Sequence, residues 1–380
     1  MPLYGSFVTR RAALLVVLSA FVGAASGASA STPVHWHLAS AELESSSVGV
    51  VVLYGPYECG RRCGDFRSRV FVREAGTWRE ITPPGMVGTL MDVVFLDRAH
   101  GWVVGNDCAR AKAAVYRTAD GGRRWRASPV GSAGCHVGSR LELVVSDERR
   151  GWILNADEVG NPPFSFSRSV DGGAAWTERR TAPIAGSVSA SASGVVWLGR
   201  SDFALPQRLY ATRDDGRTWR RRVLPPPAGW GGATVFPDTP AFFGRRGVLP
   251  VTVTRKGRAG VAFYVTSDGG ETWRFRSVRA VDFAPRRPGL PFVSYVPTSI
   301  ASPKTWWIAP GRARPEVAVT RDQGRSWEVS TRALPRARWW KISAADAEHA
   351  WLTAYTPGRA ASFTSTDGGH TWERLELPAS

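Results

Sequence analysis

A short motif, [Ser/Thr]-x-Asp-x-Gly-x-x-Trp, occurs six times in this chain of 380 residues. Its aspartates are separated by 51, 43, 54, 54 and 45 residues, which predicts one supersecondary unit per repeat. Asp can fold its carboxylate onto nearby backbone N–H groups and Gly can adopt positive φ, so the motif favours a tight turn between two strands. Its Trp offers a large apolar surface for packing between sheets, provided that the indole N–H finds a partner. The six copies contain Asp120, Asp171, Asp214, Asp268, Asp322 and Asp367, with Trp125, Trp176, Trp219, Trp273, Trp327 and Trp372.

A second periodic feature supports the same unit. Roughly 20–25 residues before each motif Trp, a small residue precedes an apolar run, as in residues 101–105 and 151–154. A further apolar run, such as residues 90–95, precedes most of these. The pattern predicts four short strands per period, here called A, B, C and D in chain order. Four strands per 40–50 residues are typical of one blade of a β-propeller.

The number of blades depends on the region before the first full motif. Residues 48–53 resemble strand B, and residues 70–78 resemble a shortened motif in which Glu74 takes the place of Asp and Trp78 follows. Terminal repeats of such arrays are often atypical. We therefore predict an all-β fold: a closed, seven-bladed β-propeller of four-stranded antiparallel blades, with six blades as the alternative. The six motifs should form C–D turns on one rim, opposite the arginine-rich loops.

The motif resembles the Asp-box, or bacterial neuraminidase repeat, of β-propellers. Over nearly the whole chain after its first 30 residues, the repeat layout resembles the single-propeller Asp-box proteins typified by photosystem II assembly factors, and more distantly the sialidase superfamily. In the assembly factors seven blades carry the box, and an arginine-rich patch helps to engage a membrane-protein client. The resemblance implies a binding platform. It also implies that the box aspartates are turn residues at the periphery.

The N-terminal segment has the pattern of an export signal. Arg10 and Arg11 precede an apolar stretch at residues 12–25, and Ala28-Ser-Ala30 matches an A-x-A cleavage site. The stretch is short for a membrane span of about 20 residues. We predict a signal peptide at residues 1–30 and a single propeller domain at residues 31–380. The protein should therefore be exported to a periplasm, a cell wall or the medium, by the general or the twin-arginine route.

Four cysteines fit an oxidising compartment. The simplest pairing is Cys59–Cys63 with Cys108–Cys135, although three connectivities are open. The spacing of Cys59 and Cys63 also permits a zinc site, but export favours disulfides.

The chain is strongly basic, with a formal charge of +17 that falls to +15 when Arg10 and Arg11 leave. Much of the arginine falls in B–C and D–A loops, which emerge on one face of a propeller. Such a face attracts anionic partners: a protein client, an anionic polymer or glycan, or a membrane surface. The alternative is that these arginines are simply solvated. The candidate partner-binding residues are Arg255, Arg258, Arg286, Arg287, Arg312, Arg314, Arg336, Arg338 and Trp339. Trp230 is a further aromatic that could stack on a ligand ring.

Export and the lack of a nucleic-acid-binding motif disfavour a nucleic-acid partner. We expect a monomer without a cofactor or a metal. An enzyme is the rival hypothesis, because Asp-box propellers include sialidases and other glycoside hydrolases. The early Arg-Ile-Pro motif of sialidases is missing. Hydrolysis needs two facing carboxylates, and none of the candidates occupies a recognisable catalytic setting: Asp65, Asp107, Asp157, Glu158 and Asp202. We therefore predict a non-enzymatic binding scaffold, with a secreted glycoside hydrolase as the alternative.

Overall fold

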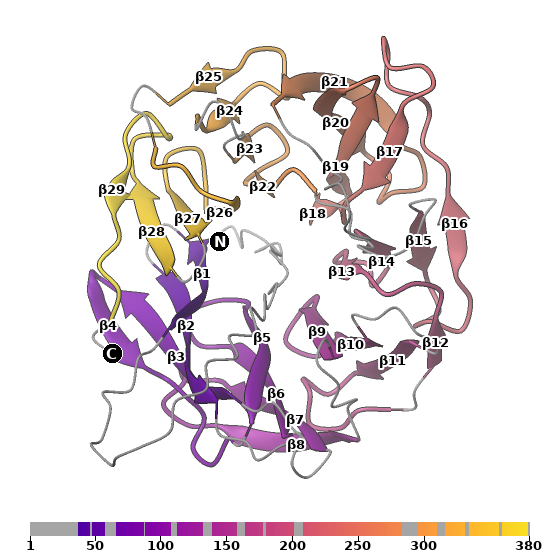
Figure 1. The fold of residues 1–380 in the computed structure, drawn as a ribbon. Coiled ribbons are helices and arrows are strands. Elements are labelled where there is room, and N and C mark those ends of the chain that lie inside the picture. The colour runs from indigo at the N-terminus through magenta and orange to yellow at the C-terminus, as the bar shows by residue number, and fades with distance from the viewer. Residues whose placement is uncertain are drawn as a thin grey trace, which may run out of the picture.

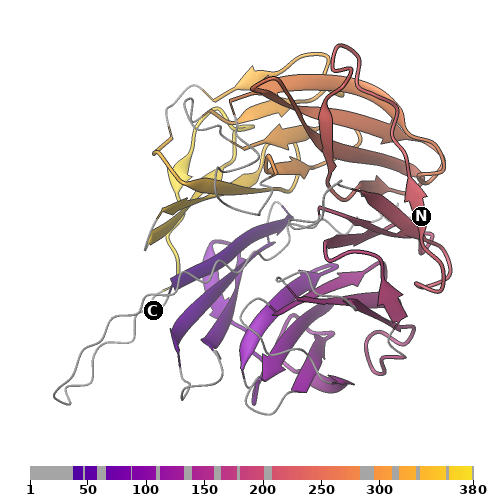
Figure 2. The same ribbon diagram turned by 45° about the vertical axis from the view of Figure 1, so that its right-hand side comes forward.

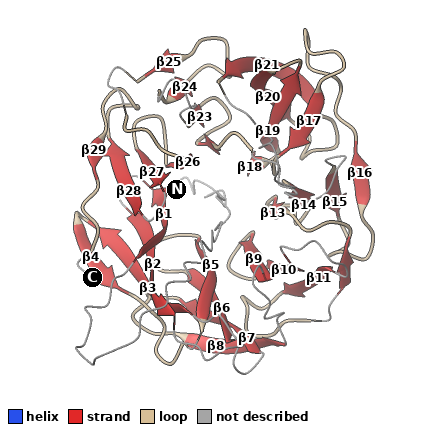
Figure 3. Cartoon of the chain, viewed as in Figure 1, coloured by secondary structure: helices blue, strands red, loops and turns tan. Residues whose placement is uncertain are grey.

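In the computed structural model of the chain, seven antiparallel sheets form a ring (Figures 1 and 3). The structure describes residues 37–45, 48–57, 66–86, 88–107, 112–131, 139–157, 164–177, 180–200, 208–282, 295–309, 316–330, 334–356 and 359–378. All regular secondary structure within these ranges is strand. Across the same residues we find no helix with the length and apolarity that crossing a bilayer requires.

Each sheet is one blade built from consecutive strands. Blade 1 contains β1 (His37–Ser45), β2 (Val48–Tyr57), β3 (Phe66–Glu74) and β4 (Thr77–Glu80), and blade 2 contains β5 (Thr89–Phe95), β6 (Gly101–Asp107), β7 (Lys112–Thr118) and β8 (Arg126–Gly131). Blade 3 contains β9 (Ser139–Val145), β10 (Gly151–Asp157), β11 (Phe164–Ser169) and β12 (Arg180–Ala182). Blade 4 contains β13 (Ser187–Ala190), β14 (Val196–Gly199), β15 (Leu209–Thr212) and β16 (Arg220–Arg222). Blade 5 contains β17 (Thr234–Pro237), β18 (Ala241–Phe243), β19 (Arg246–Arg255), β20 (Arg258–Thr266) and β21 (Arg274–Val281). Blade 6 contains β22 (Thr298–Ile300), β23 (Trp306–Ile308), β24 (Ala318–Thr320) and β25 (Glu328–Val329). Blade 7 contains β26 (Trp339–Ala344), β27 (Ala350–Thr356), β28 (Arg359–Ser365) and β29 (Glu373–Arg374).

The prediction of a seven-bladed propeller of four-stranded antiparallel blades is confirmed, with one blade whose first strand is split in two, and the six-bladed alternative is wrong. In blades other than blade 5, the first strand lies nearest the centre of the ring and the last lies at its outer edge (Figure 1). The degenerate first repeat forms a complete blade, in which Ala75 and Gly76 turn the chain between β3 and β4 with φ of 47° and 86°.

Blade 5 departs from the simple pattern because its innermost strand is interrupted. Both β17 and β18 pair with β19, at Val251–Thr254 and at Arg246–Val248 respectively. Pro237 and Pro240 flank the break, and a proline cannot donate a backbone hydrogen bond to a neighbouring strand. Blade 5 therefore has five strands.

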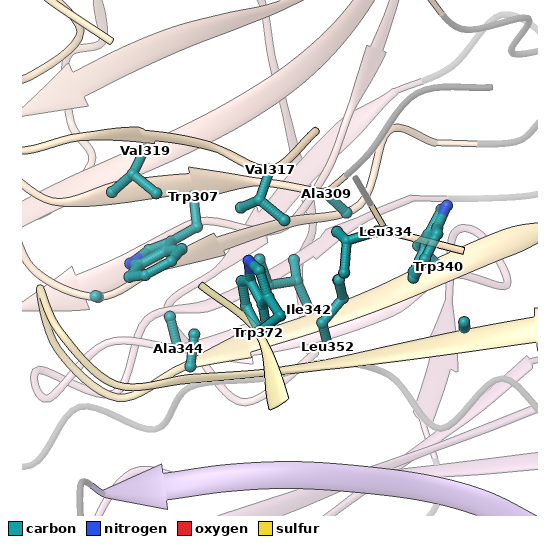
Figure 4. Close-up of a cluster of buried hydrophobic side chains, with 13 residues drawn as sticks. Trp307, Ala309, Val317, Val319, Leu334, Trp340, Ile342, Ala344, Leu352 and Trp372 are labelled. Carbon is teal, nitrogen blue, oxygen red and sulfur yellow. The ribbon is translucent and has the colours of Figure 1, made fainter. Parts of the chain in front are cut away.

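A separate cluster of apolar side chains fills each junction between blades. In the six junctions from blades 1 and 2 to blades 6 and 7, the cluster includes the motif Trp of the later blade; for example, Trp219 packs with blade 3 and Trp372 with blade 6. Trp78 of the degenerate repeat takes this place between blades 7 and 1. In the junction of blades 6 and 7, Trp307 and Trp372 meet edge to face with ring centroids 6.4 Å apart (Figure 4). Among the described residues, the indole N–H of Trp125, Trp176, Trp219 and Trp273 has no hydrogen-bond acceptor. Four of the six motif tryptophans thus contribute shape and apolar area without the partner that sequence reasoning required.

Hydrogen bonds between innermost strands add to this packing. Asp92 on β5 accepts from the N–H of Leu143 on β9 (2.8 Å), and Glu142 on β9 accepts from the N–H of Val188 on β13 (2.9 Å). Both carboxylates are buried. Each joins its blade to the next one along the chain.

The ring closes where blade 7 meets blade 1, with no strand shared between the first and last sheets (Figure 2). Ser343 Oγ accepts a hydrogen bond from Leu43 N (3.0 Å), and the Trp78 and Trp351 rings lie 6.0 Å apart. Lys341 Nζ lies 2.7 Å from Glu42 Oε1, and their side chains are 11% and 9% exposed. We call this junction the seam.

Candidate binding surface

The six motif aspartates lie in the turns between strands C and D of their blades. In blade 5 the carboxylate of Asp268 accepts from the hydroxyl of Thr266 (2.6 Å) and from both the N–H and the hydroxyl of Thr272 (3.0 and 2.6 Å). The Thr266 hydroxyl oxygen also accepts from Gly270 N (3.0 Å). Asp214, Asp322 and Asp367 make the same set of contacts. Each carboxylate is therefore occupied by its own turn.

These contacts keep the carboxylates ionised. Burial alone would raise the pKa of Asp268, but hydrogen bonds from Thr266 and Thr272 lower the pKa to about 2. The pKa of Asp214 and that of Asp367 are likewise lowered to about 2. For Asp322, hydrogen bonds from the hydroxyl and N–H of Ser326 lower the pKa well below its usual range. Carboxylates of low pKa are poor general acids at neutral pH.

Because successive strands are antiparallel, the A–B and C–D turns lie on one face of the ring, the box face. The B–C and D–A connections lie on the other, the loop face. On the box face the strand-B tryptophans reach the turn of the next blade. Trp102 Nε1 donates to Gly172 O (2.7 Å), and Trp152 Nε1 donates to the carboxylate of Asp215 (3.1 Å).

Arginines of the box face are used in the same way. Arg79 donates to Gly121 O (2.7 Å) and Arg117 to Asp171 O (3.1 Å), in each case in the turn of the following blade. Ion pairs join blade 3 to blade 4 and blade 4 to blade 5: Arg168 with Asp215, and Arg213 with Glu271. The carbonyl and carboxylate oxygens of these turns therefore partly neutralise the positive charge of the arginines that contact them.

Sequence reasoning missed a second repeated turn, between strands A and B. Asp97 accepts from the N–H groups of Ala99 and His100 (both 2.7 Å) and lies 2.9 Å from His100 Nδ1. Asp346 and His349 repeat this arrangement in blade 7. The signal was readable as Asp-x-x-[His/Arg]-[Gly/Ala]-Trp just before strand B.

The A–B turns of blades 2 and 3 together bring three possible metal ligands close to one another. Candidate ligand atoms of Asp97, His100 and Glu148 lie within 4.8 Å of one another. In blade 3, however, Arg150 takes the histidine position and its Nε lies 2.7 Å from the Asp147 carboxylate. Because arginine takes the place of histidine in an otherwise equivalent turn, the contact between Asp97 and His100 is explained by hydrogen bonding within the turn and does not require a metal.

On the loop face, Arg255 and Arg258 flank the tip of the β19–β20 hairpin and are exposed. Arg255 Nη1 donates to Gly229 O (3.5 Å), and the Arg258 guanidinium lies 5.4 Å from the centroid of the Trp230 ring. Trp230 itself is only 6% exposed and packs in the junction of blades 4 and 5. The expectation that Trp230 offers a ring to a ligand is therefore wrong, because Arg258 and the core cover it.

Arg336 and Arg338 are exposed in the segment that leads into β26. Arg338 N donates to Tyr355 O (2.8 Å). Trp339 is half-buried and stacks on the Tyr355 ring, with centroids 3.6 Å apart and planes 9° from parallel. Burial, and to a lesser extent the charge of Glu42, raises the pKa of the Tyr355 hydroxyl. Trp339 is thus already stacked within the protein.

The remaining predicted residues lie outside the part of the chain that the structure describes. They are Arg286, Arg287, Arg312, Arg314, Cys59, Cys63, Cys108 and Cys135, the signal segment, and Asp65, Glu158 and Asp202 with the side chains of Asp107 and Asp157.

The two faces differ in how their cations are compensated. Among the described residues, no carboxylate forms an ion pair with Arg255, Arg258, Arg336 or Arg338. All four are exposed. The loop face therefore carries positive charge that the protein leaves to solvent or to a partner.

Comparison with known proteins agrees with this architecture. A family model described as "Photosynthesis system II assembly factor YCF48" matches residues 72–226. The resemblance to photosystem II assembly factor-like propellers is confirmed. No curated protein matches the sequence.

Several solved structures resemble the chain in fold. A structure of YCF48 bound to a D1 peptide is 19% identical, with a TM-score of 0.45, and the match covers 77% of this chain and 82% of that one. The β-propeller domain of the trilobed protease of Pyrococcus furiosus is 12% identical, with a TM-score of 0.51, and the match covers 90% and 96%. A puromycin-hydrolyzing peptidase of Mycobacterium tuberculosis is 14% identical, with a TM-score of 0.57; the match covers 91% of this chain but 55% of the peptidase. At these identities, the two matches with TM-scores above 0.5 show the propeller fold and nothing of the chemistry.

Proposed function

We propose that this protein is an exported, non-enzymatic scaffold whose loop face binds an acidic segment of a protein client. The observation that carries the proposal is the contrast between the two faces. On the box face, Arg79, Arg117 and Arg168 are joined to carbonyl or carboxylate oxygens of the next blade. On the loop face, exposed Arg255, Arg258, Arg336 and Arg338 have no carboxylate partner among the described residues. A concentrated field of one sign speeds association with a complementary surface. The matching family model, named for an assembly factor, supports a protein client.

The box carboxylates support binding rather than hydrolysis. Glycoside hydrolysis needs one carboxyl group that can donate a proton and a second, facing carboxylate. The motif aspartates are held ionised by their own turns, and these turns are spread around the ring, one in each of blades 2 to 7. The glycoside hydrolase remains the rival that the experiment must test.

The test uses the purified exported protein and a fluorescent decaglutamate peptide, with a decaglutamine peptide of the same length as the neutral probe. We expect binding of the acidic peptide only, with an affinity that falls steeply with salt because exposed charges are screened over about 10 Å at 0.1 M ionic strength. The paired change Arg336→Glu with Arg338→Glu should weaken binding roughly tenfold, equivalent to about 1.4 kcal/mol.

A matched control places the same change of charge on the other face. Arg245 and Arg246 are exposed in the A–B turn of blade 5, and Arg245→Glu with Arg246→Glu should leave affinity nearly unchanged. Equal losses in both variants would show that only net charge matters. Turnover of a glycan or aryl-glycoside panel would refute the scaffold and favour the hydrolase.

Export is tested separately by fractionation and N-terminal sequencing. We expect the mature chain to begin near Ser31 outside the cytoplasm. Replacing Arg10 and Arg11 by Lys should block export only if the twin-arginine route is used.

A further inference from the structure

Val223 is the most exposed large apolar side chain among the described residues, with 80% of its surface open to solvent. The next most exposed are Val170 at 45% and Val329 at 41%. Val223 immediately follows β16, the outermost strand of blade 4, whose three residues are all arginine. From there the chain runs along the outside of the ring to β17 (Figure 1). A β-branched aliphatic side chain in this position costs free energy in water.

The segment that follows Val223, residues 224–233, is firmly attached to blade 5. Tyr264 donates its hydroxyl to Pro225 O (2.6 Å), and Trp230 N donates to Pro227 O (3.0 Å). Trp230 is buried between blades 4 and 5, beneath the Arg258 guanidinium. Consecutive prolines at 225–227 restrict φ still further. Val223 is therefore presented by a preorganised segment.

Two exposed cations lie next to Val223, and a third follows Arg255, which contacts Gly229 further along the same segment. Arg208 directly precedes β15, and Leu209 pairs with Arg222 on β16, which places Arg208 beside the start of this segment. Arg221 is exposed on β16, and Lys256 is exposed at the hairpin tip that Arg255 joins to Gly229. Residues 220–237 and 254–260 contain no Asp or Glu. We call Arg208, Arg221, Val223 and Lys256 the basic tip.

We infer that the basic tip docks the protein reversibly on an anionic lipid surface. Cations gain electrostatic energy near acidic head groups, and an apolar side chain that projects beyond them can enter the interfacial region. One valine offers too little area to anchor a protein alone, so docking requires the charges as well. A purely acidic polypeptide would use the cations but would gain little from Val223. The coincidence of charge and exposed apolar surface therefore favours lipid over an acidic peptide.

This inference does not rest on the proposed client. Arg336 and Arg338 of the client surface lie in the segment before β26, whereas the basic tip belongs to blades 4 and 5. Lys256 lies between Arg255 and Arg258 of the client surface, so the two activities are separated by Val223→Asp, which should leave decaglutamate binding intact, and by Arg336→Glu with Arg338→Glu, which should leave vesicle binding intact.

The experiment is flotation of the full mature protein with vesicles of phosphatidylcholine, with or without about 30 mole per cent phosphatidylglycerol, at about 0.1 M salt. We expect binding only to the anionic vesicles. Val223→Asp should reduce the bound fraction severalfold, and Val223→Phe should increase it. Arg208→Glu with Lys256→Glu should abolish binding. Soluble glycerol phosphate should not compete, because it offers charge without an apolar interior.

Val170→Asp is the matched control, because Val170 is also exposed and its position holds Ala, Arg, Ser or Thr in the other copies of the motif. It changes net charge as Val223→Asp does and should leave flotation unchanged. Equal effects of the two aspartate variants, or equal binding by Val223→Asp and Val223→Phe, would overturn the inference. If decaglutamate displaced the protein from vesicles, and bound the parent and Val223→Asp equally well, the basic tip would instead be a binding site for an acidic polypeptide. Circular dichroism of each variant confirms that the ring is folded.

Discussion

Trp102 in blade 2 donates its indole N–H to the carbonyl oxygen of Gly172 in the C–D turn of blade 3, over 2.7 Å. Trp102 is 4% exposed. The neighbouring Gly173 approaches the same ring so closely that a Cβ there would lie 3.2 Å from Trp102 Nε1. The turn motif of one blade and the strand-B tryptophan of the preceding blade therefore form one interlocking unit across the junction.

Replacing Trp102 by Phe should therefore cost more than the loss of area alone. The variant keeps most of the apolar contact but leaves Gly172 O without its donor, which should lower the free energy of unfolding by about 1–2 kcal/mol. Trp102→Ala should cost about 3–5 kcal/mol. Trp306→Phe is the control, because the buried Trp306 indole N–H has no acceptor among the described residues. Urea denaturation in which Trp306→Phe is the more damaging change would contradict the hydrogen-bond account.

Two adjacent glycines in the C–D turn of blade 5 allow the energetic cost of backbone strain to be measured separately from the cost of steric crowding. Both adopt positive φ, 79° at Gly269 and 89° at Gly270. A Cβ at Gly269 meets nothing within 4 Å, whereas one at Gly270 would lie 2.3 Å from the Trp197 ring. Gly269→Ala should cost about 1–2 kcal/mol from conformation. Gly270→Ala should cost a further 1–3 kcal/mol or so from overpacking. Equal destabilisation in thermal melts would show that the close approach to Trp197 has no energetic weight.

Asp268 should make stability depend on pH in the acid range. Its pKa is about 2 in the folded protein, below the value of about 3.9 in an unfolded chain. The carboxylate therefore stabilises the fold fully above pH 4 or so, and this contribution is lost as the pH falls towards 2. Asp268→Asn should be less stable than the parent at pH 7, with a difference that shrinks below pH 4. Urea melts showing a constant difference down to pH 2.5 would argue against the ionised carboxylate as the source.

The fold was predictable because the repeat recurs at the level of single residues. The Asp, the Gly and the Trp of each motif mark the end of strand C and the start of strand D, so the blades could be counted from the sequence. The interruption of the innermost strand in blade 5 was readable from Pro237 and Pro240 but was overshadowed by the regular spacing. The hydrogen bonds by which Asp92 and Glu142 join neighbouring blades were not predicted, because each carboxylate lies within an apolar run of strand A.

The candidate surface was harder to predict, because exposure depends on neighbours far along the chain. Arg255 and Arg258 were found from their position in a loop. Nothing in the sequence around Trp230 indicated that Arg258 and the core of blade 5 would cover its ring. Nothing in the sequence singled out Val223, which is 80% exposed in the structure. Nor could spacing reveal which arginines would reach a turn of the next blade, since that depends on the geometry of the ring.

The cysteines carry a prediction that depends on export. The exported protein should contain no free thiol, and a peptide map should recover Cys108 linked to Cys135. Labelling with a thiol reagent under denaturing, non-reducing conditions should therefore give no modified cysteine. Labelling of all four thiols, or zinc in the purified protein, would replace the disulfides by reduced cysteines or a metal site.

The seam should be the junction most sensitive to loss of a single side chain. Lys341 Nζ lies 2.7 Å from Glu42 Oε1 and 2.8 Å from Ser40 Oγ, and both charged side chains are nearly buried. Lys341→Met leaves Glu42 charged and unpaired and should cost about 3–5 kcal/mol, whereas adding Glu42→Leu should recover much of this loss. Glu142→Gln is the comparison, because blades 3 and 4 remain joined by a chain connection whatever happens to their hydrogen bond. Hydrogen exchange should then show faster opening of β1 and β26 in Lys341→Met, but no such opening in Glu142→Gln. If both variants opened all junctions alike, closure would depend on the whole ring and not on this ion pair.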